Sequence, residues 1–239
     1  MDTGTLLANM ATALNTRWQP AAGEVSDWPL PCKEGDTPFW AAVALILGQG
    51  DPSPAPAVLA ALQALSGHCL LGKNPSSQPD IPARILAVPE RQLFTLLGRC
   101  GKRTAPLRRF CFFVEQSSSS VGGDALDGLE GSGGLFETLL QVKGLGLETV
   151  ESLLLHVFCR PVFPAGPGVY RIALRHGIVP EEVSREEVAS VFVDWLGHDI
   201  PLLQSMHRHL RLTAASFCKV SSPACLGCPL EGMVCDAFE

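Results

Sequence analysis

The sequence lacks an apolar stretch long enough to cross a lipid bilayer. Its longest uncharged apolar run covers residues 38–50, and this is well short of the roughly 20 residues that a spanning helix requires. The chain also lacks the succession of basic, apolar and small residues with which a signal peptide begins. From these two absences we expect no membrane contact and a cytoplasmic location.

Positive charge is also in short supply, because 24 acidic residues outnumber 18 lysines and arginines and the formal net charge is −6. This excludes a protein coated in positive potential, although nucleic-acid binding depends on where charges lie and not only on their sum. Two stretches differ from the average, since residues 99–109 and 201–230 contain cations but no acid. Either stretch could follow a phosphate backbone, and either could equally be a solvated surface.

No segment alternates convincingly between apolar and polar residues, so the sequence does not predict β-strands. Apolar residues recur instead at helical spacing, and 46% hydrophobic residues are enough to fill a sizeable core. We therefore predict an all-α protein. The first helix should bury one face made of Leu6, Leu7, Met10 and Leu14, and further short helices are expected at 58–65, 82–88, 92–97, 107–114, 136–142 and 149–158.

Two helix starts carry capping signals. The tripeptide at 36–38 reads as a cap followed by proline in the first turn of a buried helix, which we expect to end near Gln49. Ser184 and Glu187 have the spacing of a capping box, which predicts a helix that continues to Leu196.

Four of the nine cysteines lie close together, with the spacing C-x6-C-x2-C-x6-C. They are Cys218, Cys225, Cys228 and Cys235. Short loops of this kind let four sulfurs converge on one inorganic centre and leave no open position for a substrate. A [4Fe-4S] cluster, a structural zinc ion and a pair of disulfides are the alternatives. A reducing cytoplasm disfavours disulfides, and zinc is better suited by paired CxxC motifs, so the spacing favours the cluster while zinc stays open.

Two glycines, Gly144 and Gly146, predict a tight turn between helices, together with Lys143 and Leu145. Backbone N–H groups at the start of the second helix would offer a site for an anion such as a DNA phosphate. An ordinary helix–helix turn is the alternative, because two glycines alone are a weakly specific signal.

These features together resemble the endonuclease III family, the helix-hairpin-helix DNA glycosylases with a [4Fe-4S] loop near the C-terminus. Residues 142–171 align to the family pattern without a gap, and the cysteines follow at the expected distance, although their last interval is one residue longer than usual. The resemblance includes residues 37–49 and so covers most of the chain from Thr37 onward. It is similar in particular to the branch with bacterial 3-methyladenine glycosylases, at residues 148–149, 152–154, 160–163 and 175–177.

The resemblance implies two helical domains, a six-helix barrel with the hairpin at residues 37–160 and an iron–sulfur domain made of residues 1–36 and 161–239. It also implies a [4Fe-4S] cofactor held by the four cysteines, and double-stranded DNA that lies across the cleft between the domains with a damaged base flipped out. We expect a monomer. The residues expected to contact DNA are Gln49, Lys102, Arg103, Lys143, Gly144, Leu145 and Gly146.

Both residues that the family uses for catalysis are replaced. The lysine that attacks the sugar in bifunctional members corresponds to Glu148, so the usual lyase chemistry is not expected. The aspartate that stabilises the cationic sugar corresponds to Gly166, in a run of prolines and glycines at 164–168 that we expect to form a loop. Glu148 could supply the missing carboxylate, or it could simply complement the dipole of its own helix.

Three functions therefore follow from the sequence. The first is a base-excision DNA glycosylase of altered or weak activity, without lysine-based lyase chemistry. The second is a catalytically silent protein that recognises lesions or distorted duplex DNA. The third is a redox or structural protein that uses the cluster and does not touch DNA.

Overall fold

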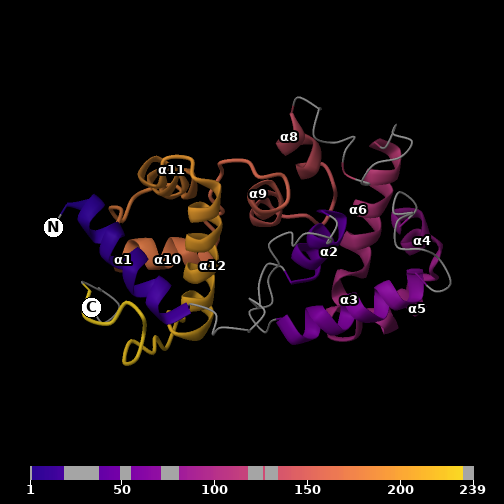
Figure 1. Cartoon of the computed structure of the whole chain (residues 1–239), viewed down its shortest axis with the longest axis horizontal. Coiled ribbons are helices and arrows are strands. Elements are labelled where there is room, and N and C mark those ends of the chain that lie inside the picture. Colours follow the sequence, from indigo (N-terminus) through magenta and orange to yellow (C-terminus); the bar gives the residue numbers. More distant parts are fainter. Residues whose placement is uncertain are drawn as a thin grey trace. The chain divides into compact units, whose positions relative to one another are not determined.

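The computed structural model describes residues 2–18, 38–48, 55–70, 81–117, 126 and 134–233. Every regular element in these residues is a helix, which confirms the all-α prediction. The helices belong to two compact units, one made of Met1–Ser26 with Cys159–Glu239 and the other made of Asp27–Phe158 (Figure 1). Within the described ranges, no helix combines the length and the apolar character that crossing a membrane requires.

The unit of residues 27–158 contains a helix that is buried on nearly every side. This helix, α2 (Pro38–Gly48), has nine buried residues among its 11, because none of its side chains is charged and requires water. Phe39 stacks on Phe110, with 6.2 Å between the ring centroids. The other helices of the unit are α3 (Ala55–Leu70), α4 (Ile81–Ala87), α5 (Glu90–Leu97), the 3-10 helix η1 (Gly98–Arg103), α6 (Thr104–Ser117), α8 (Leu135–Leu140) and α9 (Leu147–His156) (Figure 1).

The other unit is arranged around its longest helix, which contacts the three other helices of the unit. Phe163 stacks on Phe192 of the helix at residues 185–196, with their ring centroids 4.4 Å apart. Trp18 ties the N-terminal helix to the longest one, because its Nε1 donates to Thr213 Oγ1 at 3.0 Å. The helices are α1 (Thr3–Trp18), α10 (Pro167–Arg175), α11 (Arg185–Leu196) and α12 (Ile200–Ser216). The side chains that α1 buries include the predicted Leu6, Leu7, Met10 and Leu14.

The capping box predicted at Ser184 is confirmed. The Ser184 hydroxyl accepts from the N–H of Glu187 at 3.1 Å, and the Glu187 carboxylate accepts from the N–H of Ser184 at 2.7 Å. The helix that follows ends at Leu196, as expected. The buried helix expected near the N-terminus does begin at Pro38, whereas its cap and Gln49 lie outside the described residues.

Two expectations about helix ends are wrong. The helix predicted to reach residue 142 ends at Leu140, because the residues that follow form the turn before α9. The run at 164–168, predicted to be a loop, becomes helical at Pro167, the first residue of α10. Proline is well suited to this place, since the first turn of a helix needs no N–H for internal hydrogen bonds and the ring fixes a helical φ.

Candidate functional site

The turn between α8 and α9 combines one buried residue with an exposed backbone. Leu145 is only 6% exposed and its N–H donates to the carbonyl of Val142 at 3.0 Å, which closes the turn. Gly144 has φ +101°, a conformation that side chains with a Cβ rarely adopt, and a Cβ there would lie 3.1 Å from Pro106 Cγ. Lys143, by contrast, is exposed. Gly144 and Leu145 therefore determine the conformation of the turn, and the Lys143 side chain stays accessible to solvent.

Helix α9 begins at this turn, and its N-terminal end is a candidate site for an anion. Gly146 is the N-cap residue of α9, and the first N–H groups of an α-helix point away from the helix and toward possible ligands. These donors and the positive end of the helix dipole favour an anion. Glu148 lies half-exposed in the first turn, where its carboxylate is also favoured by the dipole.

The basic stretch at 99–109 contacts this turn, and Arg109 supplies a hydrogen bond to it. Arg109 Nη1 donates to the carbonyl of Lys143 at 3.0 Å. Arg108, the preceding residue, donates instead to the carbonyl of Val88 at 2.8 Å and so supports the packing of α4 on α6. Of the two predicted DNA contacts in the stretch, Lys102 is exposed and Arg103 is half-buried at the end of η1. Sequence reasoning did not single out Arg109 for this role.

Gly166 is buried at the N-cap of α10 and offers no side chain for chemistry. Two residues further on, a Cβ on Gly168 would lie 2.7 Å from Cβ of Ala214 in α12, closer than real Cβ contacts allow. The glycine at 168 thus lets α10 and α12 approach closely. The position predicted to correspond to the family's aspartate therefore lies in a segment that allows close helix packing.

The C-terminal loop brings three of the four predicted cysteine ligands around one cavity. Cys218 is buried, Cys225 and Cys228 are half-buried, and all three line a cavity of about 340 Å³. The short turn from Cys225 to Cys228 is closed by the N–H of Cys228, which donates to the carbonyl of Cys225 at 3.0 Å, and Gly227 supplies its left-handed φ of +79°. Apolar walls are contributed by Phe217, Leu226, Leu230 and Met233.

Two arginines of α10 hold the start of this loop. Arg171 donates from Nε and Nη2 to the carbonyl of Cys218 at 2.7 and 2.5 Å. Arg175 donates to the Sγ of Cys218 at 3.3 Å and to the carbonyls of Lys219 and Val220 at 2.8 and 3.0 Å. A guanidinium at this distance suits a sulfur that carries negative charge as a metal ligand. Sequence reasoning missed both arginines, and their only local signal is a spacing of four residues on one helix face.

The cavity contains three of the four sulfurs that the predicted cluster requires. Within the described part of the chain, no group of three histidines, cysteines or carboxylates converges closely enough to hold one ion. A zinc ion would need its sulfurs about 2.3 Å from one point. The three described cysteines line this cavity and offer sulfur ligands of the kind that hold iron–sulfur clusters. Cys235, the fourth predicted ligand, lies outside the described residues.

Sequence comparison finds relatives with names from DNA repair. A protein of Methanocaldococcus jannaschii named as a candidate DNA repair glycosylase is 27% identical over 93 residues, which cover 39% of this chain and 42% of that protein. The endonuclease III of Rickettsia conorii is 29% identical over 167 residues, which cover 66% of this chain and 70% of that protein. No protein-family model matches the chain.

The fold has close counterparts among solved structures. An endonuclease III in a non-covalent complex with DNA superposes with a TM-score of 0.67 at 18% identity, covering 99% of this chain and 97% of that one. An H. pylori 3-methyladenine DNA glycosylase bound to 1,N6-ethenoadenine superposes with a TM-score of 0.60 at 17% identity, covering 90% and 97%. At these identities the superpositions establish the fold alone. Sequence similarity and fold together support the assignment of this chain to the endonuclease III family.

Proposed function

We propose that this protein binds double-stranded DNA in base excision repair, flips a damaged base, and has altered or weak glycosylase activity without lysine-based lyase chemistry. The observation that carries the proposal is the pair of replacements at Glu148 and Gly166. Glu148 keeps an ionisable group at the start of α9, whereas Gly166 provides no carboxylate at the start of α10. A sugar cation would therefore lose the usual electrostatic partner, and no amine stands in the position that could form a Schiff base.

DNA contact is proposed at three places in the unit of residues 27–158. The turn offers the N–H groups at the start of α9 and the exposed Lys143, and η1 adds Lys102 and Arg103. Gln49 would fill the space that a flipped base leaves in the duplex. Because the net charge of the chain is −6, the affinity should depend on this local cluster and fall steeply as salt is raised.

A [4Fe-4S] cluster held by Cys218, Cys225, Cys228 and Cys235 is part of the proposal. Such a cluster would crosslink the C-terminal loop and could exchange one electron. The arginine contacts to Cys218 and the cavity shared by three cysteines support this assignment. We also propose that the functional domains are residues 37–160 and residues 1–36 with 161–239, and that the protein acts as a monomer.

A single-turnover assay tests the enzymatic part of this proposal. Excess protein is incubated with duplexes that each carry one damaged base, and abasic sites are revealed by alkali. We expect slow release of at least one base, no strand cleavage without alkali, and no borohydride-trapped adduct. If the wild-type protein produces no abasic site on any duplex that it binds, the glycosylase assignment is wrong.

Glu148→Gln distinguishes the two roles of the carboxylate. If Glu148 stabilises the transition state, base release should slow on the order of 10²-fold with DNA binding retained. If it only complements the helix dipole, release should be unchanged and stability should fall by about 0.3 to 1 kcal/mol. Glu137→Gln, at an exposed position in α8, serves as the matched control.

The second candidate function is a silent protein that recognises lesions. The buried glycine at position 166 favours it, because no side chain in that place could replace the carboxylate. Tighter binding to damaged than to intact duplex, combined with no base release, would establish this function. Absence of salt-dependent duplex binding would reject both candidates.

A further inference from the structure

Helix α6 exposes an aromatic stripe on the side that faces away from the core. The side chains on this stripe follow helical spacing along about 10 Å of the helix axis. Phe112 is 58% exposed, more than any other aromatic side chain that the structure describes. The stripe consists of Arg109, Phe112, Phe113 and Gln116, and the buried stripe opposite consists of Leu107, Phe110, Cys111 and Val114.

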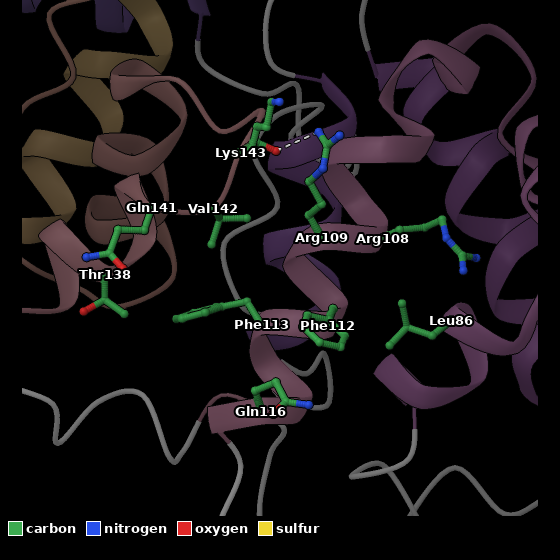
Figure 2. A pocket seen from close by; sticks show the side chains of 10 residues that line it. All are labelled: Leu86, Arg108, Arg109, Phe112, Phe113, Gln116, Thr138, Gln141, Val142 and Lys143. Carbon is green, nitrogen blue, oxygen red and sulfur yellow. Dashed lines mark hydrogen bonds between the residues drawn. The ribbon is translucent and has the colours of Figure 1, made fainter.

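The stripe forms one wall of a groove with a volume of about 620 Å³, which lies in the range of small-ligand sites. The facing wall comes from the end of α8 and the turn before α9, with Thr138, Gln141 and Lys143. Figure 2 shows Phe112 and Phe113 projecting from α6, with Gln141 and Thr138 to one side of them and Gln116 one turn below. The groove therefore combines flat apolar rings with amide and hydroxyl groups.

The charge of the groove is unlike that of the chain as a whole. Among its ten lining residues are three cations, Arg108, Arg109 and Lys143, and no acid, whereas the chain carries a net charge of −6. Cations beside exposed rings suit a ligand that is both polyanionic and able to present planar faces. Single-stranded nucleic acid has these properties, because its unpaired bases can stack on aromatic side chains while its phosphates meet cations.

We propose that this groove binds a short stretch of single-stranded nucleic acid. A base stacks on Phe112, the amides of Gln116 and Gln141 donate to and accept from base edges, and Lys143 contacts a phosphate. A duplex cannot use the groove in this way, since the faces of its bases are covered by their neighbours. The groove adjoins the turn at Lys143, so part of this inference rests on the proposed phosphate contact there. An unpaired strand leaving that contact would enter the groove.

The test measures binding of a fluorescent oligothymidylate and of an intact duplex to the full-length protein by anisotropy at low salt. We expect the wild-type protein to bind the oligothymidylate. Phe112→Ala should weaken this binding by at least about five-fold, the effect of losing one base-stacking contact, and leave duplex binding unchanged. Phe112→Trp should restore it because it keeps a flat ring. Leu202→Ala, at a 48% exposed position in α12, is the control for loss of exposed apolar surface.

Three outcomes would overturn the proposal. They are failure of the wild-type protein to bind the oligothymidylate, equal binding by wild type and Phe112→Ala, and a loss in Phe112→Ala that is confined to duplex or is matched by Leu202→Ala. The proposed repair function fails separately. If the protein binds the oligothymidylate through Phe112 but binds no duplex, the groove stands and the duplex function does not.

Discussion

Two short non-helical segments carry the candidate chemistry of this protein, and they are held in different ways. The turn before α9 is closed by its own backbone, and Arg109 donates a side-chain hydrogen bond to its carbonyl at Lys143. The cysteine loop after α12 is held at its start by Arg171 and Arg175, which come from another helix. Both segments thus combine local backbone hydrogen bonds with contacts from a neighbouring helix, and the loop depends more heavily on such contacts and, as we propose, on a cofactor.

Removal of the proposed cluster should have the largest effect on stability, and it should affect the cysteine loop and not the turn. The purified protein should show broad visible absorption, and Cys228→Ser or iron chelation should abolish it. Because metal binding to such loops is coupled to folding, we expect a loss of several kcal/mol, which corresponds to a fall of roughly 10 °C in Tm. Amide exchange should accelerate in residues 217–233 and stay unchanged at the turn.

Cys159→Ser is the matched control for the cluster prediction, because Cys159 is exposed and lies outside the loop. This variant should keep the colour and the Tm of the wild type. A colourless protein that contains zinc would contradict the assignment of the cluster, and the loop would then have to close around a single ion.

Replacing one arginine in each region tests the comparison directly. Arg175→Ala removes hydrogen bonds to the Sγ of Cys218 and to two carbonyls, so we expect a loss of about 2 to 3 kcal/mol in the free energy of unfolding. Arg109→Ala removes one bond at an exposed position and should cost about 0.5 to 1 kcal/mol. Urea unfolding of the iron-loaded proteins measures both values. Equal losses would mean that the turn depends on its arginine as much as the loop does.

The sequence predicts the helices well where the signal is local. The capping box at Ser184 and Glu187 needs only residues three apart, and the buried face of α1 needs only helical spacing. The start of helix α10 is not predicted from the sequence, because its first residues, Pro167 and Gly168, are typical of a loop. Pro167 suits the first turn of a helix, and Gly168 allows close contact with Ala214 of α12, 46 residues away in the chain, which the sequence alone does not show.

The candidate site could be predicted only in part, for the same reason. Cysteine spacing indicates the ligands but not the arginines that support them, because Arg171 and Cys218 are 47 residues apart. The groove beside α6 is equally hard to predict from the sequence. Phe112 and Phe113 adjoin Phe110 and Cys111 in the sequence, so apolar residues occur on both faces of α6 and periodicity alone does not show which face is exposed. Both features arise from tertiary structure.

The last predicted effect concerns acid, and it sharpens the comparison at the helix that leads into the cysteine loop. His209 in α12 is only 4% exposed, and neither of its ring nitrogens has a hydrogen-bond partner among the described residues. Burial, and to a smaller extent the charge of Arg208, lowers the pKa of His209 from 6.5 to about 4. The neutral imidazole is therefore the form that the folded protein favours.

The sign of the pH dependence follows from this lowered pKa. Between pH 6.5 and about 4 the unfolded chain binds a proton at His209 that the folded protein does not bind, so stability is fully present above pH 6.5 and is lost as the pH falls toward 4. We expect His209 to account for about 1 to 3 kcal/mol of the loss in the free energy of unfolding between pH 7 and pH 4.5.

Urea unfolding at the two pH values measures the loss. As the pH falls, amide hydrogen exchange should accelerate first in α12 and the adjoining cysteine loop, and only later at the turn before α9. His209→Leu should remove this part of the pH dependence, whereas His68→Gln, at an exposed position, should keep it. The same loss in wild type and His209→Leu would show that other groups cause the acid sensitivity, and that α12 is no more vulnerable to acid than the rest of the fold.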